Sequence, residues 1–216
     1  MNSVDRNGLS SDPISWYESY LAEEAAGEAA QPSYDPLVDL RDYAKELKKT
    51  DNSDCLNLAL LAFKAGQVSE RNHDARNEAP YALLNVLTEY YYYGIGIFRE
   101  NSSDYYRVGV RRSDRHYDGG FGQTGFSSQF LDRDPASQNQ VRHFAFWFAV
   151  GFSPIPGEIA LARLYEAEGT SSMENPDVAL GVLAYKSGAA YQGDYRQTAQ
   201  DIWHTVCGES SNLDLK

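Results

Sequence analysis

Apolar residues recur along most of this 216-residue chain with the spacing of an amphipathic α-helix. In the segment 36–49, an apolar stripe returns every three or four positions, while the lysines lie outside it. The stripe consists of Leu37, Leu40, Tyr43, Ala44 and Leu47. The same pattern predicts about eight helices, over residues 13–26, 36–49, 53–65, 78–93, 138–152, 156–168, 176–192 and 195–207.

Proline and glycine mark where these helices are expected to begin and end. Asp35-Pro36 and Asn175-Pro176 each place a capping side chain before a proline that suits the first helical turn. Glycine tolerates the left-handed conformation that ends many helices, so five glycines are predicted helix stops. They are Gly66, Gly94, Gly169, Gly193 and Gly208.

The last two predicted helices form a hairpin. Gly193 ends the first of them and Asp194 caps the second, which is typical of a tight connection between antiparallel helices. Gly181 and Gly188 lie inside the helix 176–192, where intrinsic propensity disfavours them. We therefore expect another helix to approach closely at these two positions.

The segment 138–152 is predicted to be an interior helix. Ser137 and Gln140 form a capping-box pattern at its start, and apolar or aromatic residues occupy every face beyond the first turn. Arg142 and His143 stand side by side near this start. Both side chains need partners, because an unpaired polar or charged group is costly to bury.

Residues 99–137 break the helical pattern, and so long an irregular stretch is usually either functional or disordered. Its many aromatic and aliphatic residues favour burial and argue against disorder. The alternation in residues 106–110 ("YRVGV") favours a short strand or hairpin. The four glycines of residues 119–126 ("GGFGQTGF") let the backbone approach a neighbour closely. We expect this loop to close over the start of the helix 138–152.

These patterns predict an all-α fold. We expect a single globular helical domain over residues 36–216, with one long irregular loop rich in glycine, arginine and tyrosine at 99–137. Residues 1–35 are expected to be an N-terminal arm with one marginal helix, because the segment "AEEAAGEAA" has helical propensity but little apolar face.

The distribution of charge singles out the middle of the chain. The formal net charge is −12, which disfavours binding to nucleic acid or to an anionic membrane. Between Arg99 and Arg142, however, there are seven arginines, no lysine and six acidic residues, so this window alone is positive. Guanidinium groups suit carboxylate and phosphate ligands. An alternative is that the aspartates of the window pair with the arginines and hold the loop in place.

The two cysteines, Cys55 and Cys207, lie near opposite ends of the chain without a metal-binding or redox spacing. The chain also lacks a recognisable export signal and an apolar run long enough to span a membrane. We therefore expect two free thiols, a soluble protein and a cytoplasmic location.

The candidate catalytic residues are Arg142 and His143, with Asp118 or Asp132 to orient the imidazole. Burial and nearby positive charge would keep His143 neutral, and so able to act as a base. The helix start and Arg142 together favour an anionic ligand. The candidate ligand-binding residues are Gly119, Gly120, Gly122, Gln123, Thr124, Asn139 and Gln140.

A structural interpretation of the same residues stays open. In it, Arg142 pairs with an aspartate of the loop, while Asn139 and His143 bond backbone carbonyl groups. We predict neither a metal site nor a cofactor, because the histidines show no ligand spacing and no P-loop or Rossmann fingerprint is present.

The residues support two functional hypotheses. The first is a non-catalytic binding or regulatory protein that engages a protein partner or a small anionic ligand through residues 99–143, with a homo-oligomer as a further expectation. The second is a hydrolase or lyase in which His143 is the general base and Arg142 holds an anionic group of the substrate.

Overall fold

The computed structural model of the protein describes residues 36–71, 79–87, 90–91, 110–111, 121–133 and 138–215. The predicted N-terminal arm and most of the predicted loop 99–137 lie outside these ranges, as does the predicted helix 13–26. The described residues belong to one helical domain that begins at Pro36.

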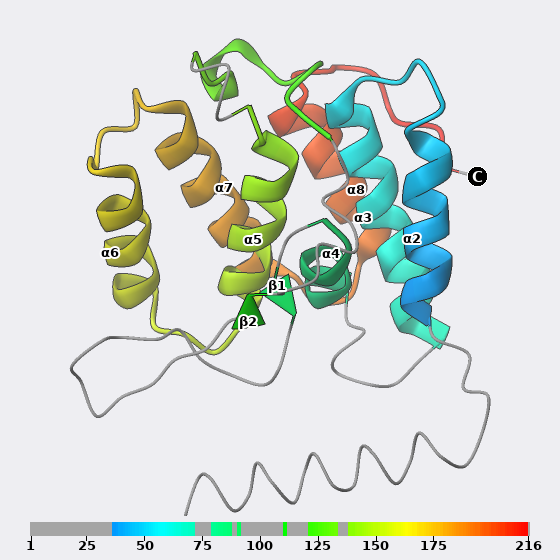
Figure 1. Ribbon diagram of the computed structural model, residues 1–216, viewed down its shortest axis with the longest axis horizontal. Helices are drawn as coiled ribbons and strands as arrows, with labels where there is room; N and C mark the ends of the chain where they lie inside the picture. Colours follow the sequence, from blue (N-terminus) through cyan, green and yellow to red (C-terminus); the bar gives the residue numbers. More distant parts are fainter. Residues whose placement is uncertain are drawn as a thin grey trace, which may run out of the picture. The chain divides into compact units, whose positions relative to one another are not determined.

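The domain is all-α, as the apolar spacing predicts (Figure 1). Its described helices are α2 (Pro36–Leu47), α3 (Asp54–Arg71), α4 (Ala79–Leu87), α5 (Gln140–Phe152), α6 (Gly157–Glu168), α7 (Pro176–Ala190) and α8 (Tyr195–Asp201). One π-helical turn, Ile202–Val206, continues α8, and a short 3₁₀ turn spans Ser128–Phe130. The strands β1 (Tyr90–Tyr91) and β2 (Val110–Arg111) pair antiparallel over two residues each.

Several predicted helix ends are confirmed by the backbone. The side chain of Asn175 accepts hydrogen bonds from the N–H groups of Asp177 and Val178 at the start of α7. Gly169 ends α6 in the left-handed conformation, with a φ of 65°. At the predicted hairpin, Asp194 caps α8 by accepting from the N–H of Gln197.

Two large differences from the predicted helix ends concern α4 and α3, and the predicted stop Gly94 lies outside the described residues. The helix predicted over 78–93 ends at Leu87, and Tyr90 and Tyr91 pair with β2, because aromatic residues suit a strand as readily as a helix. Gly66 does not end α3, which continues to Arg71. A Cβ at Gly66 would overlap the side chain of Tyr195, so this glycine allows α8 to lie close to α3.

The start of α5 also differs from the prediction. The helix begins at Gln140 and its N-cap residue is Asn139, whose side chain makes no capping hydrogen bond. The predicted capping residue, Ser137, lies outside the described residues. The helix therefore starts two residues later than expected.

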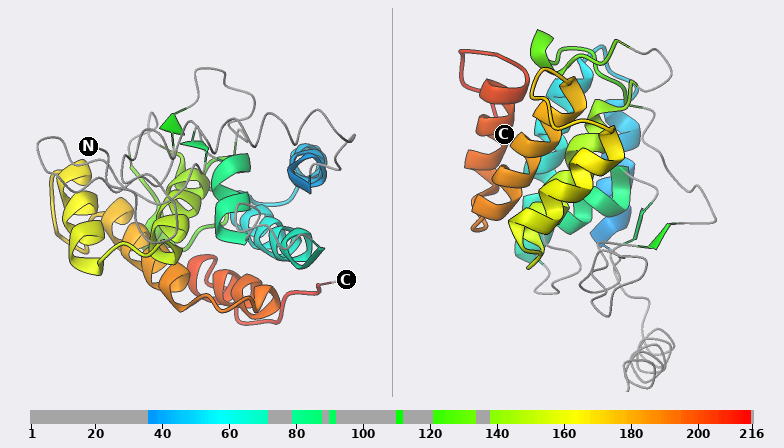
Figure 2. Two further views of the ribbon diagram at one scale, coloured as in Figure 1. Left: turned by 90° about the horizontal axis from the view of Figure 1, so that it is seen from below. Right: turned by 90° about the vertical axis from the view of Figure 1, so that its left-hand side faces the viewer.

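The pair α5 and α7 forms the most extensive contact between described helices (Figure 2). A Cβ at Gly151 would overlap the carbonyl oxygen of Tyr185, and a Cβ at Gly188 would overlap that of Phe148. The two backbones thus meet at glycine on both sides, which confirms the close approach predicted from Gly188. Around this crossing, Phe144 and Phe148 of α5 are fully buried.

The predicted free thiols are wrong, because Cys55 and Cys207 form a disulfide with Cα atoms 5.7 Å apart. Cys55 lies in the first turn of α3, and Cys207 directly follows the π turn at the end of α8. Because the two cysteines are 152 residues apart in sequence, no local pattern indicated that these two helix ends meet in space.

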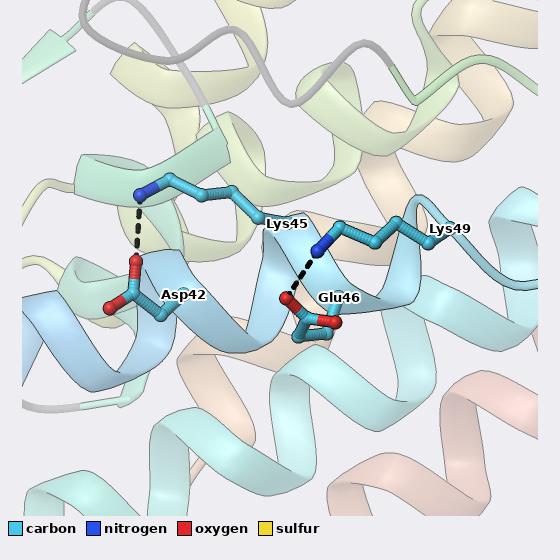
Figure 3. A network of polar contacts seen from close by, with 4 residues as sticks. All are labelled: Asp42, Lys45, Glu46 and Lys49. Atoms are coloured by element: carbon cyan, nitrogen blue, oxygen red, sulfur yellow. Dashed lines mark hydrogen bonds and ion pairs between the residues drawn. The ribbon is translucent and has the colours of Figure 1, made fainter.

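The outer surface of α2 carries ordinary exposed ion pairs. Lys45 contacts Asp42, and Lys49 contacts Glu46, each across three residues of the helix (Figure 3). Such pairs contribute about 0 to 1 kcal/mol each, because water and side-chain entropy offset most of the attraction. None of the described helices combines the length and the apolar character needed to cross a bilayer.

Candidate functional site

The candidate site lies at the end of the domain where α5 and α7 begin and α6 ends (Figure 1). The close crossing of α5 and α7 places the first turn of one helix against the first turn of the other. Gln140 and His143 come from α5, Asp177 from α7 and Glu168 from the last turn of α6. The loop residues 121–133 cover the start of α5.

His143 is the centre of this group. Its Nε2 lies 2.8 Å from the backbone carbonyl oxygen of Asp177. A carbonyl oxygen can only accept, so Nε2 carries the proton and Nδ1 carries the lone pair. Gly181, one turn further along α7, makes room for the ring, because a Cβ there would lie 3.0 Å from Nε2.

The pKa of His143 is lowered from its ordinary value of 6.5, and burial is the main cause. The charges of Asp177 and Asp132 and the hydrogen bond to the Asp177 carbonyl act in the opposite direction. A neutral imidazole agrees with the prediction, although the neighbouring charges named here are negative and not positive.

Gln140 ties the two helices together at their first turns. Its side chain is 0% exposed, and its Nε2 donates to Oδ1 of Asp177 at 2.9 Å. Asp177 also lies in the first turn of α7, where the partial positive charge of the helix terminus stabilises a carboxylate. The hydrogen bond between the buried amide of Gln140 and the carboxylate of Asp177 thus fixes the first turn of α5 against the first turn of α7.

A pair of carboxyl groups completes the cluster. A side-chain hydrogen bond to Asp177 favours the protonated form of Glu168. The pKa of Glu168 is raised from its ordinary value of 4.5 by burial, by the charges of Asp177 and Asp132, and by this hydrogen bond. All of these causes favour the protonated form of Glu168 over its carboxylate.

The glycine-rich loop makes its polar contacts within the protein. The carbonyl oxygen of Gly122 accepts a hydrogen bond from the N–H of Val141. The loop therefore satisfies one of the N–H groups that have no partner within α5 at the start of the helix. The amide of Gln123 bonds both the N–H and the carbonyl of Asp132. Thr124 donates to the Asp54 carboxylate through its N–H and its hydroxyl group. These bonds favour a structural role for Gln123 and Thr124.

The other predicted site residues divide into two groups. Asp132 lies close enough to His143 to influence the pKa of the imidazole. The carbonyl oxygen of Asn139 accepts a hydrogen bond from the backbone N–H of His143. Arg142 is partly buried beside them in α5 and also has an interaction partner. In the second group, Asp118, Gly119 and Gly120 lie outside the described residues.

Sequence reasoning missed Asp177 and Glu168. Asp177 follows the Asn175-Pro176 start signal, but only the α5–α7 crossing brings it to His143. Glu168 stands before the predicted helix stop at Gly169, and it reaches Asp177 because α6 and α7 are joined by a short connection. The pattern thus located both residues at helix ends, without showing that those ends meet.

The cluster combines an imidazole whose neutral form is favoured with a carboxyl group whose protonated form is favoured. Among the described residues, no three histidine, cysteine, aspartate or glutamate side chains are placed to hold a metal ion. A surface groove of about 390 Å³ lies elsewhere, between the end of α7 and α8, and Tyr191, Gln197 and Asp201 contribute to its lining. That groove is separate from His143.

Glu168→Gln is expected to raise the free energy of unfolding at neutral pH by roughly 1 kcal/mol or less, since solvent screens this partly exposed pair. The pKa of Glu168 is raised on folding, so its stabilising contribution is complete below the unfolded value and is lost as pH rises through the folded value. Glutamine keeps a donor toward Asp177 at every pH.

Thermal unfolding at about pH 4 and about pH 7.5 measures this difference, because the contribution of Glu168 is complete below its unfolded value of 4.5 and decreases as pH rises. The variant should match the wild-type protein at the lower pH and exceed it at the higher. Glu166→Gln is the control, because Glu166 is 66% exposed and pairs with Arg163 of its own helix. An equal increase in stability in both variants would contradict the proposed pairing of Glu168 with Asp177.

Comparison with known proteins identifies no relative of this chain. No protein-family model, curated protein sequence or solved structure matches this chain.

Proposed function

We propose that this chain is a non-catalytic binding or regulatory protein that engages a basic segment of a protein partner. The contact surface is the end of the domain formed by the first turns of α5 and α7, the end of α6 and the loop 121–133. One observation carries the proposal: the Nε2–H of His143 is already bonded to the carbonyl of Asp177.

The hydrogen bonds of the site support binding over catalysis. The side chain of Gln140 is enclosed and directed to Asp177, and those of Gln123 and Thr124 hold the loop in place. Polar groups that reacted with a substrate would need to be reachable by it. Here they connect helices to one another, which suits a rigid surface that presents its outer side chains to a partner.

The charge of the site favours a basic partner over the small anionic ligand. The surface so defined contains five acidic residues and two arginines, which are Asp132, Glu166, Glu168, Glu174 and Asp177, and Arg133 and Arg142. Glu166 and Glu174 are exposed at this end of the domain. Complementary charge steers a partner to such a surface and becomes less effective as salt is added.

The enzyme remains a second proposal because of one specific observation. Folding favours the neutral form of His143, with a lone pair on Nδ1, and the protonated form of Glu168, which together resemble a general base and a general acid. In a hydrolase or lyase, His143 would take a proton from substrate or water. Arg142 would hold the anionic group of the substrate.

The disulfide also bears on where the protein acts. The cytoplasmic location was predicted from free thiols, and the Cys55–Cys207 bond removes that support. We place the protein instead in a compartment that keeps this pair oxidised, since disulfides persist mainly in oxidising surroundings.

Native mass spectrometry of protein purified from its source identifies the partner, and binding of that partner is then measured with two charge-reversed variants. Glu174→Lys should weaken binding by about tenfold, because it reverses a charge on the proposed surface. Glu46→Lys is the control, since Glu46 is 67% exposed on α2, on the opposite side of the domain (Figures 1 and 3). Loss of binding in the control alone would overturn the proposed surface.

His143→Gln distinguishes the two proposals. The glutamine amide can still donate to the Asp177 carbonyl, so the variant keeps the structural hydrogen bond and loses the imidazole. The binding protein should keep its affinity for the partner in this variant. An enzyme that uses His143 as its base would lose its activity while remaining folded.

A further inference from the structure

The loop 121–130 lies across both cysteines of the disulfide. The N–H of Cys55 donates to the carbonyl of Thr124 at 3.0 Å. On the other side, the N–H of Ser127 donates to the carbonyl of Val206 at 2.9 Å, directly before Cys207. The loop is therefore hydrogen bonded to both of the helix ends that the disulfide joins.

The same loop reaches the start of α5. The N–H of Val141 donates to the carbonyl of Gly122 at 3.3 Å, and the buried rings of Phe121, Phe126 and Phe130 fix the loop to the core. A Cβ at Gly208 would lie 2.7 Å from the Ser127 hydroxyl, so the chain after Cys207 also passes close to the loop. The position of the loop over α5 thus depends on the position of the disulfide-linked ends.

The two cysteines differ in how far a reagent can approach them. Cys55 is 0% exposed, whereas Cys207 is 9% exposed and precedes an exposed glycine near the surface. Thiol–disulfide exchange needs a thiolate to reach one sulfur atom. Of the two cysteines, Cys207 is therefore the more accessible residue.

We propose that the Cys55–Cys207 disulfide is a redox-controlled latch that holds the loop 121–130 over the start of α5. A dithiol reductant attacks Sγ of Cys207 through one thiolate, the bond between the two protein sulfurs breaks, and Cys55 leaves as a thiolate that takes up a proton. The second thiol of the reductant then releases Cys207 as a thiol. The protein gains two electrons and two protons, and the dithiol becomes a disulfide.

Release of the latch affects the loop and leaves the helix pair α5–α7 in place. That pair is held by the glycine crossing at Gly151 and Gly188 and by the Gln140–Asp177 hydrogen bond, and neither involves α3 or α8. The loop, in contrast, is bonded to residues next to each sulfur. The reduced protein is therefore folded, with an uncovered first turn of α5. This consequence does not depend on which partner or substrate the protein has.

Hydrogen exchange of the oxidised protein and of the protein treated with dithiothreitol tests the latch. The amides of Cys55 and Val141 donate hydrogen bonds to carbonyl groups of the loop, and the amide of Ser127 in the loop donates to Val206. Exchange of these three amides should become about tenfold faster or more on reduction. The protected amides of α7 exchange through unfolding of the whole domain, so they should accelerate only with the overall loss of stability and stay slower than these three amides in the reduced protein. Unchanged rates at these three amides would overturn the latch, and so would exchange of these amides in the reduced protein at the same rate as the most protected amides of α7, because the loop would then open only with the whole domain.

The variant Cys55→Ser/Cys207→Ser provides the control. Without reductant it should show the fast exchange of the reduced protein at the Ser127 and Val141 amides, and dithiothreitol should add nothing. If this variant does not fold, reduction of the wild-type protein still decides the question. A further effect of dithiothreitol on a folded variant would mean that the reductant acts elsewhere, and would also overturn the latch.

Discussion

Gly188→Ala is expected to lower the free energy of unfolding by about 3 kcal/mol, at the upper end of the range for an overpacked core. The new Cβ would overlap the carbonyl oxygen of Phe148 and lie 2.9 Å from the backbone nitrogen of Phe152. Both of these atoms belong to the α5 backbone, which cannot rotate away as a side chain can. The two central helices must therefore separate.

Chemical denaturation of the variant measures this loss. Ala189→Leu is the matched control, since it adds more bulk at the next residue of α7, where the side chain is exposed. Its stability should stay within about 0.5 kcal/mol of the wild-type value. If Gly188→Ala is as stable as this control, α5 and α7 do not cross at backbone distance.

The second large effect is expected from loss of the disulfide. Cys55→Ser/Cys207→Ser should lower the free energy of unfolding by roughly 4 to 5 kcal/mol, because the bond closes a very long loop in the unfolded chain. For a domain of this size, the loss corresponds to a decrease in Tm of about 10 to 20 °C. The 152-residue separation of the two cysteines is the reason for so large an effect.

Calorimetry on the variant and on reduced wild-type protein checks this expectation. The two samples should unfold at nearly the same temperature, since each lacks only the covalent link. Equal stability of the oxidised protein and the variant would show that Cys55 and Cys207 are not joined in solution.

The sequence predicted most of the helices because their signals are local. Asn175 before Pro176, Gly169 and the Gly193-Asp194 pair each act within a few residues of the helix end they define. The close approach of another helix at Gly188 was also predicted, because glycine inside an apolar helix suggests a close neighbour, but the sequence did not identify that neighbour as α5.

The errors arise where distant segments decide the outcome. Gly66 has the local character of a helix stop, yet α3 continues and the missing side chain makes room for Tyr195 of α8. Tyr90 and Tyr91 continue an apolar pattern but pair with β2. Cys55 and Cys207 meet only because the fold brings the start of α3 to the end of α8.

The candidate site was predicted in part for the same reason. His143 and Gln140 were identified from the polar start of an apolar helix, and Asp132 from its place in the preceding loop. The residues that complete the cluster, Asp177 and Glu168, come from α7 and α6, whose approach no local signal encodes. The roles predicted for Gly122, Gln123 and Thr124 rested on composition, whereas their contacts hold helix ends together.

The arrangement at His143 also sets the direction of its pH dependence. Its pKa is lowered on folding, so the folded state favours the neutral ring. The stabilising contribution of neutral His143 is therefore complete above the unfolded value of 6.5 and is lost as pH falls through the folded value. This is opposite in sign to the contribution of Glu168.

Both functional proposals depend on the packing of the first turns of α5 and α7, with His143 bonded to the Asp177 carbonyl. Nitrogen-15 NMR of the imidazole through a pH titration tests this packing most directly. We predict a neutral ring with its proton on Nε2 that remains neutral at pH 6.5, the ordinary pKa of histidine. A ring protonated on Nδ1 when neutral, or one that titrates at the ordinary value, would contradict this arrangement.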